Sequence, residues 1–227
     1  FPEHRYIIPA SSVSHKDIPM LFAFTAPEAL DVARVGGKGF GLARATQAGL
    51  PVPDGVILPT DTYRAWFTPH QVHIATLLAE NRDAQAQSAA ITAYLATQPL
   101  PDVLIAQLNV LQTAHPERYF AVRSSGSAED LPGAAFAGLH DTLLNVHGVD
   151  ALKQCWLSLW NAEVLPYRER LGVAHEIAAM AVVIQQMVDV AADGAAGVAF
   201  SIDPVRGEVD TVLINAAFGL GETVVAG

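Results

Sequence analysis

The hydrophobic pattern of this 227-residue chain changes near residue 119, and that change limits the folds that it can adopt. Before this point apolar residues recur at helical spacing, and residues 70–114 favour two or three alanine-rich helices with breaks at 81–82 and 98–101. After it, strand-like runs become frequent. Helices followed by strands, without strict alternation, predict an α+β fold with a mostly antiparallel sheet in the second part.

Local signals place individual elements within this pattern. Strands are predicted at 21–24, 55–58, 119–122, 180–188, 196–202 and 210–217. Helices are predicted at 38–48, after a cap at Thr60 or Asp61, and at 149–171. The chain divides into a lead-in segment (1–30), a helix-rich lobe (31–118) and a strand-rich lobe (119–227), and we expect both lobes to belong to one domain.

Three side chains of the last predicted helix are assigned to the core. Trp156 and Trp160 follow its apolar spacing, and Cys155 is expected to be buried next to them. Because Cys155 is the only cysteine, the chain has neither an internal disulfide framework nor a cysteine-based zinc site. His70 and His73 are three residues apart, but only Glu80 is nearby to complete a ligand set, so they are interpreted as surface residues and not as a metal site.

Composition excludes further classes of protein. The 23 acidic and 13 basic residues give a net charge of −10, which argues against non-specific binding to nucleic acid. No apolar run approaches the roughly 18–20 residues that a membrane-spanning helix requires. We therefore expect a globular protein of the cytoplasm. Because the chain begins with Phe1 and not with Met, we also expect it to be a processed or shortened product.

A glycine-rich turn, Val35–Leu42, directly precedes the first long helix. Glycines let backbone amides approach a ligand closely, and a helix N-terminus carries partial positive charge. Lys38 adds a compact cation that suits phosphate. The Walker A motif is not met, because Gly39 stands where Ser or Thr is required, and Arg44 breaks the dinucleotide fingerprint. A flexible helix start with a solvated lysine remains the alternative.

A second polar turn follows the predicted strand at 119–122. Arg123 is followed by three serines and a glycine within four residues, and such a group can surround an anion. The alternative is a capped turn in which Glu129 or Asp130 holds the arginine. His140 and Asp141 lie further along, but no nucleophile elbow accompanies them, which argues against a hydrolase triad.

Together the two turns resemble the nucleotide-binding domain of the pyruvate phosphate dikinase and phosphoenolpyruvate synthase family. The resemblance covers about residues 28–227 and is closer to the branch of phosphoenolpyruvate synthase and rifampicin phosphotransferase than to the dikinases. It is carried, in order, by Gly36–Gly39, Ala48–Pro53, Val122–Pro132, Phe136–Gly138, Cys155–Trp160, Tyr167–Arg168, Ala181–Met187, Gly197–Pro204 and Gly219–Glu222.

The resemblance implies an ATP-grasp-like domain in an ATP-dependent phosphotransferase. In such enzymes ATP phosphorylates a histidine on a separate swivelling domain, which carries the group to an acceptor such as pyruvate. Lys38 and Arg123 would then act on the phosphates as catalytic and binding residues. The other implied binding residues are Ser124, Gly138 and Thr142 near the phosphates, Gln185 beside the adenine, and Glu222 at the nucleotide cleft.

Departures from the family keep other functions open. Leu139 replaces a usual Gln, and Gly126 replaces a usual Ala. Relatives continue beyond residue 227 with Mg²⁺ ligands of the same domain, so we expect an incomplete domain with no metal ligand in this chain. The swivelling and acceptor-binding domains would lie in the parent chain or in separate subunits, and the isolated chain is not expected to turn over alone. A regulatory nucleotide-binding module and an interaction domain without nucleotide are the alternatives.

Overall fold

The computed structural model describes residues 21–81, 83–114, 116, 118–126, 142–146, 150–175, 178–190, 194–221 and 224. The chain forms two compact units, which divide between Met187 and Val188. The predicted lobe boundary at 118–119 falls inside the first unit, whose sheet takes strands from both predicted lobes. The division into those lobes therefore stays a prediction.

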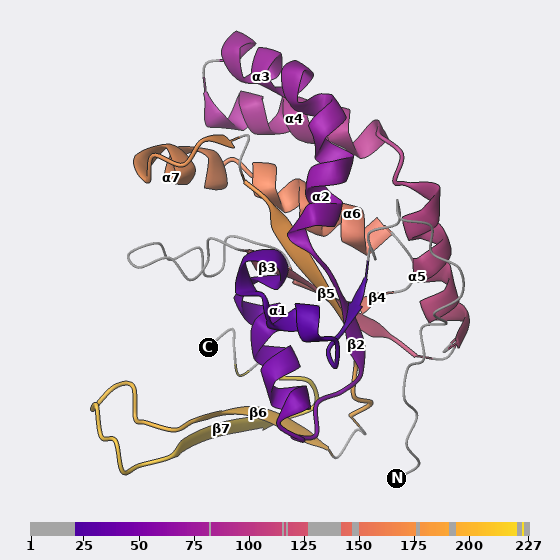
Figure 1. Cartoon of the computed structure of the whole chain (residues 1–227). Coiled ribbons are helices and arrows are strands. Elements are labelled where there is room, and N and C mark those ends of the chain that lie inside the picture. Colours follow the sequence, from indigo (N-terminus) through magenta and orange to yellow (C-terminus); the bar gives the residue numbers. More distant parts are fainter. Residues whose placement is uncertain are drawn as a thin grey trace. The chain divides into compact units, whose positions relative to one another are not determined.

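The first unit is built on a five-stranded antiparallel sheet (Figure 1). Its order is β1 (Phe22–Ala23), β2 (Gly55–Leu58), β5 (Met180–Gln186), β3 (Phe120–Gly126) and β4 (Thr142–Val146). The central strand, β5, is buried from Met180 to Gln185, because helices cover both faces of the sheet. Mixed helix and antiparallel sheet confirm the predicted α+β class.

The α-helices of the first unit are α1 (Val32–Gln47), α2 (Thr60–Phe67), α3 (Gln71–Glu80), α4 (Ala84–Thr97), α5 (Asp102–Ala114), α6 (Asp150–Leu157) and α7 (Val164–Arg170). Short 3₁₀ turns lie at η1 (Pro27–Leu30), η2 (Thr68–His70) and η3 (Ser158–Trp160). As expected, α1 ends just before Gly49, which adopts a positive φ of 79°. Among the described helices, none is long and apolar enough to cross a membrane.

Two apolar cores lie on opposite faces of this sheet. On the face that we call the α1 face, α1 packs on the sheet (Figure 1). The core on this face contains Ile57, Ala181 and Val183. The opposite face is covered by the remaining helices, and its core contains a stacked pair formed by Trp66 and Trp156 with ring centroids 5.0 Å apart. Trp156, Trp160 and Cys155 are fully buried, so their assignment to the core is confirmed.

Two helix predictions need correction. The single helix predicted at 149–171 is divided into α6, η3 and α7, because the backbone at Asn161 is extended (ψ 146°) and interrupts the helical bonds. The N-cap of α2 is Pro59, and Thr60 is already its first helical residue, so neither Thr60 nor Asp61 caps this helix.

The polar turn predicted to follow residue 122 also begins later in the chain than expected. Ser124, Ser125 and Gly126 are the last residues of β3, and Thr142 is the first residue of β4, a strand that the pattern did not predict. The three small residues of β3 pair in register with the start of β5. Pairing with a fully buried strand outweighs the turn preference of serine and glycine.

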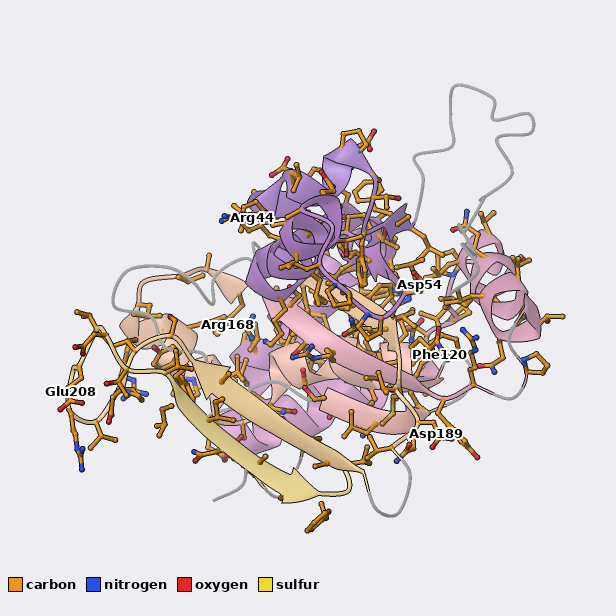
Figure 2. All side chains as sticks on the ribbon, turned by 90° about the horizontal axis from the view of Figure 1, so that it is seen from below. Arg44, Asp54, Phe120, Arg168, Asp189 and Glu208 are labelled. Carbon is orange, nitrogen blue, oxygen red and sulfur yellow. The ribbon has the colours of Figure 1, made fainter. Side chains whose placement is uncertain are left out.

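The second unit contains an antiparallel hairpin of β6 (Ala195–Phe200) and β7 (Leu213–Phe218). In the connection, the Asp203 carboxylate accepts hydrogen bonds from the backbone N–H groups of Val205 (2.8 Å) and Arg206 (3.0 Å). Gly207 follows with φ of 72°, and Glu208 lies at the tip of this loop (Figure 2). A turn therefore separates the two strands predicted at 196–202 and 210–217.

Candidate functional site

The glycine-rich turn Val35–Leu42, which carries Lys38 and which we call the glycine–lysine turn, lies within α1 and interrupts it. Helix α1 begins at Val32, six residues before the predicted start, but Gly36 has φ of 67° and ψ of 172° and breaks the helical path. A second helical segment therefore starts just after Gly36, and Lys38 lies in its first turn. The N–H groups of such a first turn point away from the helix and attract anions.

The part of α1 before the break is fixed to α2. The Arg34 guanidinium donates to the Asp61 carboxylate over 2.8 Å, and the Thr60 hydroxyl donates to the Ala33 carbonyl over 3.3 Å. Asp61 also accepts from Arg64 over 3.3 Å. Because one carboxylate pairs with both guanidinium groups, we do not assign either arginine to an anion site.

The part of α1 after the break is fixed to β3 through one hydroxyl group. Ser125, which is fully buried, donates from Oγ to the Val35 carbonyl over 2.8 Å and accepts from the Gly39 N–H over 3.1 Å. The contact at Gly36 is so close that a Cβ atom there would lie 2.4 Å from both oxygen atoms of Ser125. The glycine–lysine turn is thus packed directly on β3, the strand that carries Arg123 and that we call the arginine strand. The two contacting residues, Gly39 and Ser125, are 86 residues apart in the sequence.

Strand geometry brings three more of the predicted site residues to the α1 face. Side chains of a strand alternate between faces, so Arg123 lies on the same face as Ser125, roughly 7 Å along β3. Thr142 of β4 is the direct partner of Arg123. On the other side of Arg123, β5 contributes Gln185, two residues beyond the partner of Arg123. The Gln185 amide donates to the Pro53 carbonyl over 3.1 Å, which fixes its orientation.

The exposure of these side chains is compatible with a site open to a ligand. Lys38 and Arg123 are half-buried, Thr142 is exposed and Gln185 is buried, with 9% of its surface exposed. The guanidinium, hydroxyl and amide on this face, with Lys38 in the helix that packs on it, are groups that can bind an anion together with a hydrogen-bonding group. Arg44, at the other end of α1, is exposed and distant in sequence from the break (Figure 2).

Ser124 does not share this face. It alternates with Arg123 and Ser125, and its side chain lies on the opposite face with 1% of its surface exposed. The residue that contacts the turn is Ser125, which was not assigned to the site. Alternation would have selected it once Arg123 and its neighbours were recognised as strand residues. Gly138 and Glu222 lie outside the described residues, as do Leu139, His140 and Asp141.

The described residues contain no group of three or more His, Cys, Asp or Glu side chains that could hold a metal ion. His70 instead contacts the Tyr94 hydroxyl through Nδ1 at 3.0 Å, and the His73 ring lies 4.2 Å from the Tyr94 ring. Burial, with a further contribution from His73, lowers the pKa of His70. This pair therefore packs on an aromatic ring of α4.

Comparison with known proteins identifies the family of the chain that carries this face. Residues 32–227 match the family described as pyruvate phosphate dikinase, AMP/ATP-binding domain. The chain belongs to this family. The resemblance seen in the sequence is thereby confirmed, and the AMP/ATP-binding domain includes both turns of the site.

Curated relatives of this AMP/ATP-binding domain are larger proteins. The chain is 38% identical over 212 residues to phosphoenolpyruvate synthase of Aeropyrum pernix, covering 85% of this chain and 25% of the relative. It is 38% identical over 214 residues to a probable phosphoenolpyruvate synthase of Methanothermobacter thermautotrophicus (87% and 31%). It is 36% identical over 213 residues to rifampicin phosphotransferase of a Streptomyces species (88% and 24%). The chain thus spans about a quarter to a third of these relatives.

Proposed function

We propose that the α1 face of the first unit binds ATP and presents its polyphosphate for transfer. The observation that supports this is the double hydrogen bond of Ser125, which packs the glycine–lysine turn against the arginine strand. In this proposal Lys38 and Arg123 bind the phosphates. The remaining proposed contacts are Gly138 and Thr142 near the phosphates, Gln185 at the adenine and Glu222 at the nucleotide cleft. Ser124 is not proposed as a nucleotide contact, because its side chain faces the opposite core.

Electrostatics explains why two local cations matter here. The chain has a net charge of −10, so its overall field repels a polyphosphate. Half-buried cations at short range, together with the N–H groups of a helix start, act in a lower dielectric than bulk water and overcome that field. Holding the phosphates in line is most of what phosphoryl transfer requires of a protein.

We further propose that this domain serves a phosphotransferase similar to phosphoenolpyruvate synthase. The phosphoryl group would pass from ATP to a histidine on a separate swivelling domain and then to an acceptor such as pyruvate. The support is the family membership and the names of the relatives. An ATP-grasp-like arrangement of the domain, Mg²⁺ as the companion of ATP and a cytoplasmic location complete the proposal; no Mg²⁺ ligand is assigned among the described residues.

Binding of a non-hydrolysable ATP analogue with Mg²⁺, measured by calorimetry, tests the nucleotide site. Lys38→Ala and Arg123→Ala should each weaken binding by at least about 1.5 kcal/mol, as expected for a hydrogen bond to a charged group. Arg44→Ala is the matched control, because it removes an exposed cation from the same helix. Unchanged affinity in both site variants would refute the proposed site.

Transfer is tested separately, because a regulatory module would bind ATP without passing on phosphate. The chain is incubated with ATP labelled in its phosphates and with a swivelling domain expressed from a relative. Label on the histidine of that domain would support the proposed role of the chain in a phosphotransferase. Tight ATP binding without any transfer of label would favour the regulatory module instead.

A further inference from the structure

The break in α1 has an unusual hydrogen-bonding pattern. Val35 and Gly39 are four residues apart, and in an uninterrupted helix the Gly39 N–H would donate to the Val35 carbonyl. Here both groups bond to the same hydroxyl, that of Ser125. The hydroxyl of a neighbouring strand is therefore inserted at the position of a helical hydrogen bond, which is a recognised cause of helix breaks.

The surroundings of this hydroxyl leave it little freedom to adopt another arrangement. Ser125 has no exposed surface, and its Oγ both donates and accepts a buried bond. Only a glycine at position 36 fits against it, because a Cβ would come within 2.4 Å of the serine. A buried donor or acceptor without a partner is costly, so the insertion and the break stabilise each other.

We infer that Ser125 is a positioning residue that holds the break open and thereby fixes Lys38 relative to Arg123. This inference rests on the proposed function. Arg123 is two residues before Ser125 in β3, where it pairs with Val183 and Thr142. The same strand thus carries one phosphate-binding cation and, through Ser125, holds the turn that carries the other. No part of this role requires Ser125 to touch the nucleotide.

Removal of the hydroxyl should release the turn and leave the strand intact. In Ser125→Ala the Gly39 N–H either bonds directly to the Val35 carbonyl, which closes the break, or loses its buried partner. Both outcomes uncouple Lys38 from Arg123. We expect the affinity for the ATP analogue to fall by about tenfold, as for the loss of one well-placed contact.

A matched control separates positioning from a general loss of stability. Ser158 is also buried, and its hydroxyl donates to the Cys155 carbonyl over 2.7 Å within the opposite core. Ser158→Ala should lower the melting temperature and leave the affinity unchanged. In addition, Ser125→Ala should have no further effect on affinity in a Lys38→Ala background, because the lysine that it positions is already absent. Additive losses would contradict the positioning role.

A measurement without nucleotide tests the insertion itself. Amide hydrogen exchange at Gly39 should be slow in the unaltered chain and should change in Ser125→Ala but not in Ser158→Ala. Unchanged exchange at Gly39, or full affinity of Ser125→Ala for the analogue, would overturn this inference while the Lys38 and Arg123 results could still support the ATP site. If the unaltered chain fails to bind the analogue, the proposed function fails and the positioning role fails with it.

Discussion

The substitution Gly36→Ala tests the geometry on which the candidate site depends. Gly36 has φ of 67° and ψ of 172°, a backbone conformation that is almost restricted to glycine, and another residue there costs about 1–3 kcal/mol. The added Cβ would also lie 2.4 Å from the backbone oxygen and from Oγ of Ser125. Since β3 is paired on both sides, by β4 and β5, its backbone cannot move away easily.

Relief of this overlap should cost a further 1–3 kcal/mol or so, as for other overpacked sites. The free energy of unfolding should therefore fall by about 2–6 kcal/mol, the sum of the two costs. For a chain of this size, that lowers the melting temperature by at least about 4 °C. The same variant should also bind the ATP analogue less tightly, because the turn that carries Lys38 is displaced.

Gly41→Ala is the matched control for this substitution. Gly41 lies in the regular part of α1 and is exposed, and an added Cβ would meet nothing within 4 Å. Alanine there should raise the free energy of unfolding by up to about 1 kcal/mol. Thermal and urea denaturation measure both variants. If Gly36→Ala proves as stable as Gly41→Ala, this result would contradict the positive φ of Gly36 and its close contact with Ser125.

Two further predictions concern the opposite core and its edge. The Tyr63 hydroxyl accepts a buried hydrogen bond from Trp160 Nε1 over 3.1 Å, so Tyr63→Phe should lower the free energy of unfolding in urea by about 1–3 kcal/mol; an unchanged midpoint would contradict the bond. Burial lowers the pKa of His70 from 6.5, so the folded state disfavours its protonation. The contribution of neutral His70 to the free energy of unfolding is therefore fully present above pH 6.5. It is lost as the pH falls from 6.5 through the lowered pKa. Between about pH 7 and pH 5 the melting temperature of His70→Gln should fall less than that of the unaltered chain, and equal slopes would refute this.

Much of the secondary structure could be predicted from local signals. The strand at Gly55–Leu58 and the helices α3 to α5 follow directly from apolar runs, from breaks at 81–82 and 98–101 and from spacing. These features depend on neighbours in the sequence, so a pattern is sufficient to find them. Ser124–Gly126 did not follow this rule, because serine and glycine favour turns and only pairing with β5 makes them strand residues.

The sequence by itself determined the chemistry of the candidate site: a lysine among glycines before a helix, an arginine followed by serines, and a resemblance that the family match confirms. Only the tertiary structure decided which of these groups share a face. It placed Ser125 beside the turn and Ser124 in the other core, because faces alternate along a strand once its register is set. It also broke α1 at Gly36, since the hydroxyl that replaces the helical bond comes from a strand more than eighty residues away.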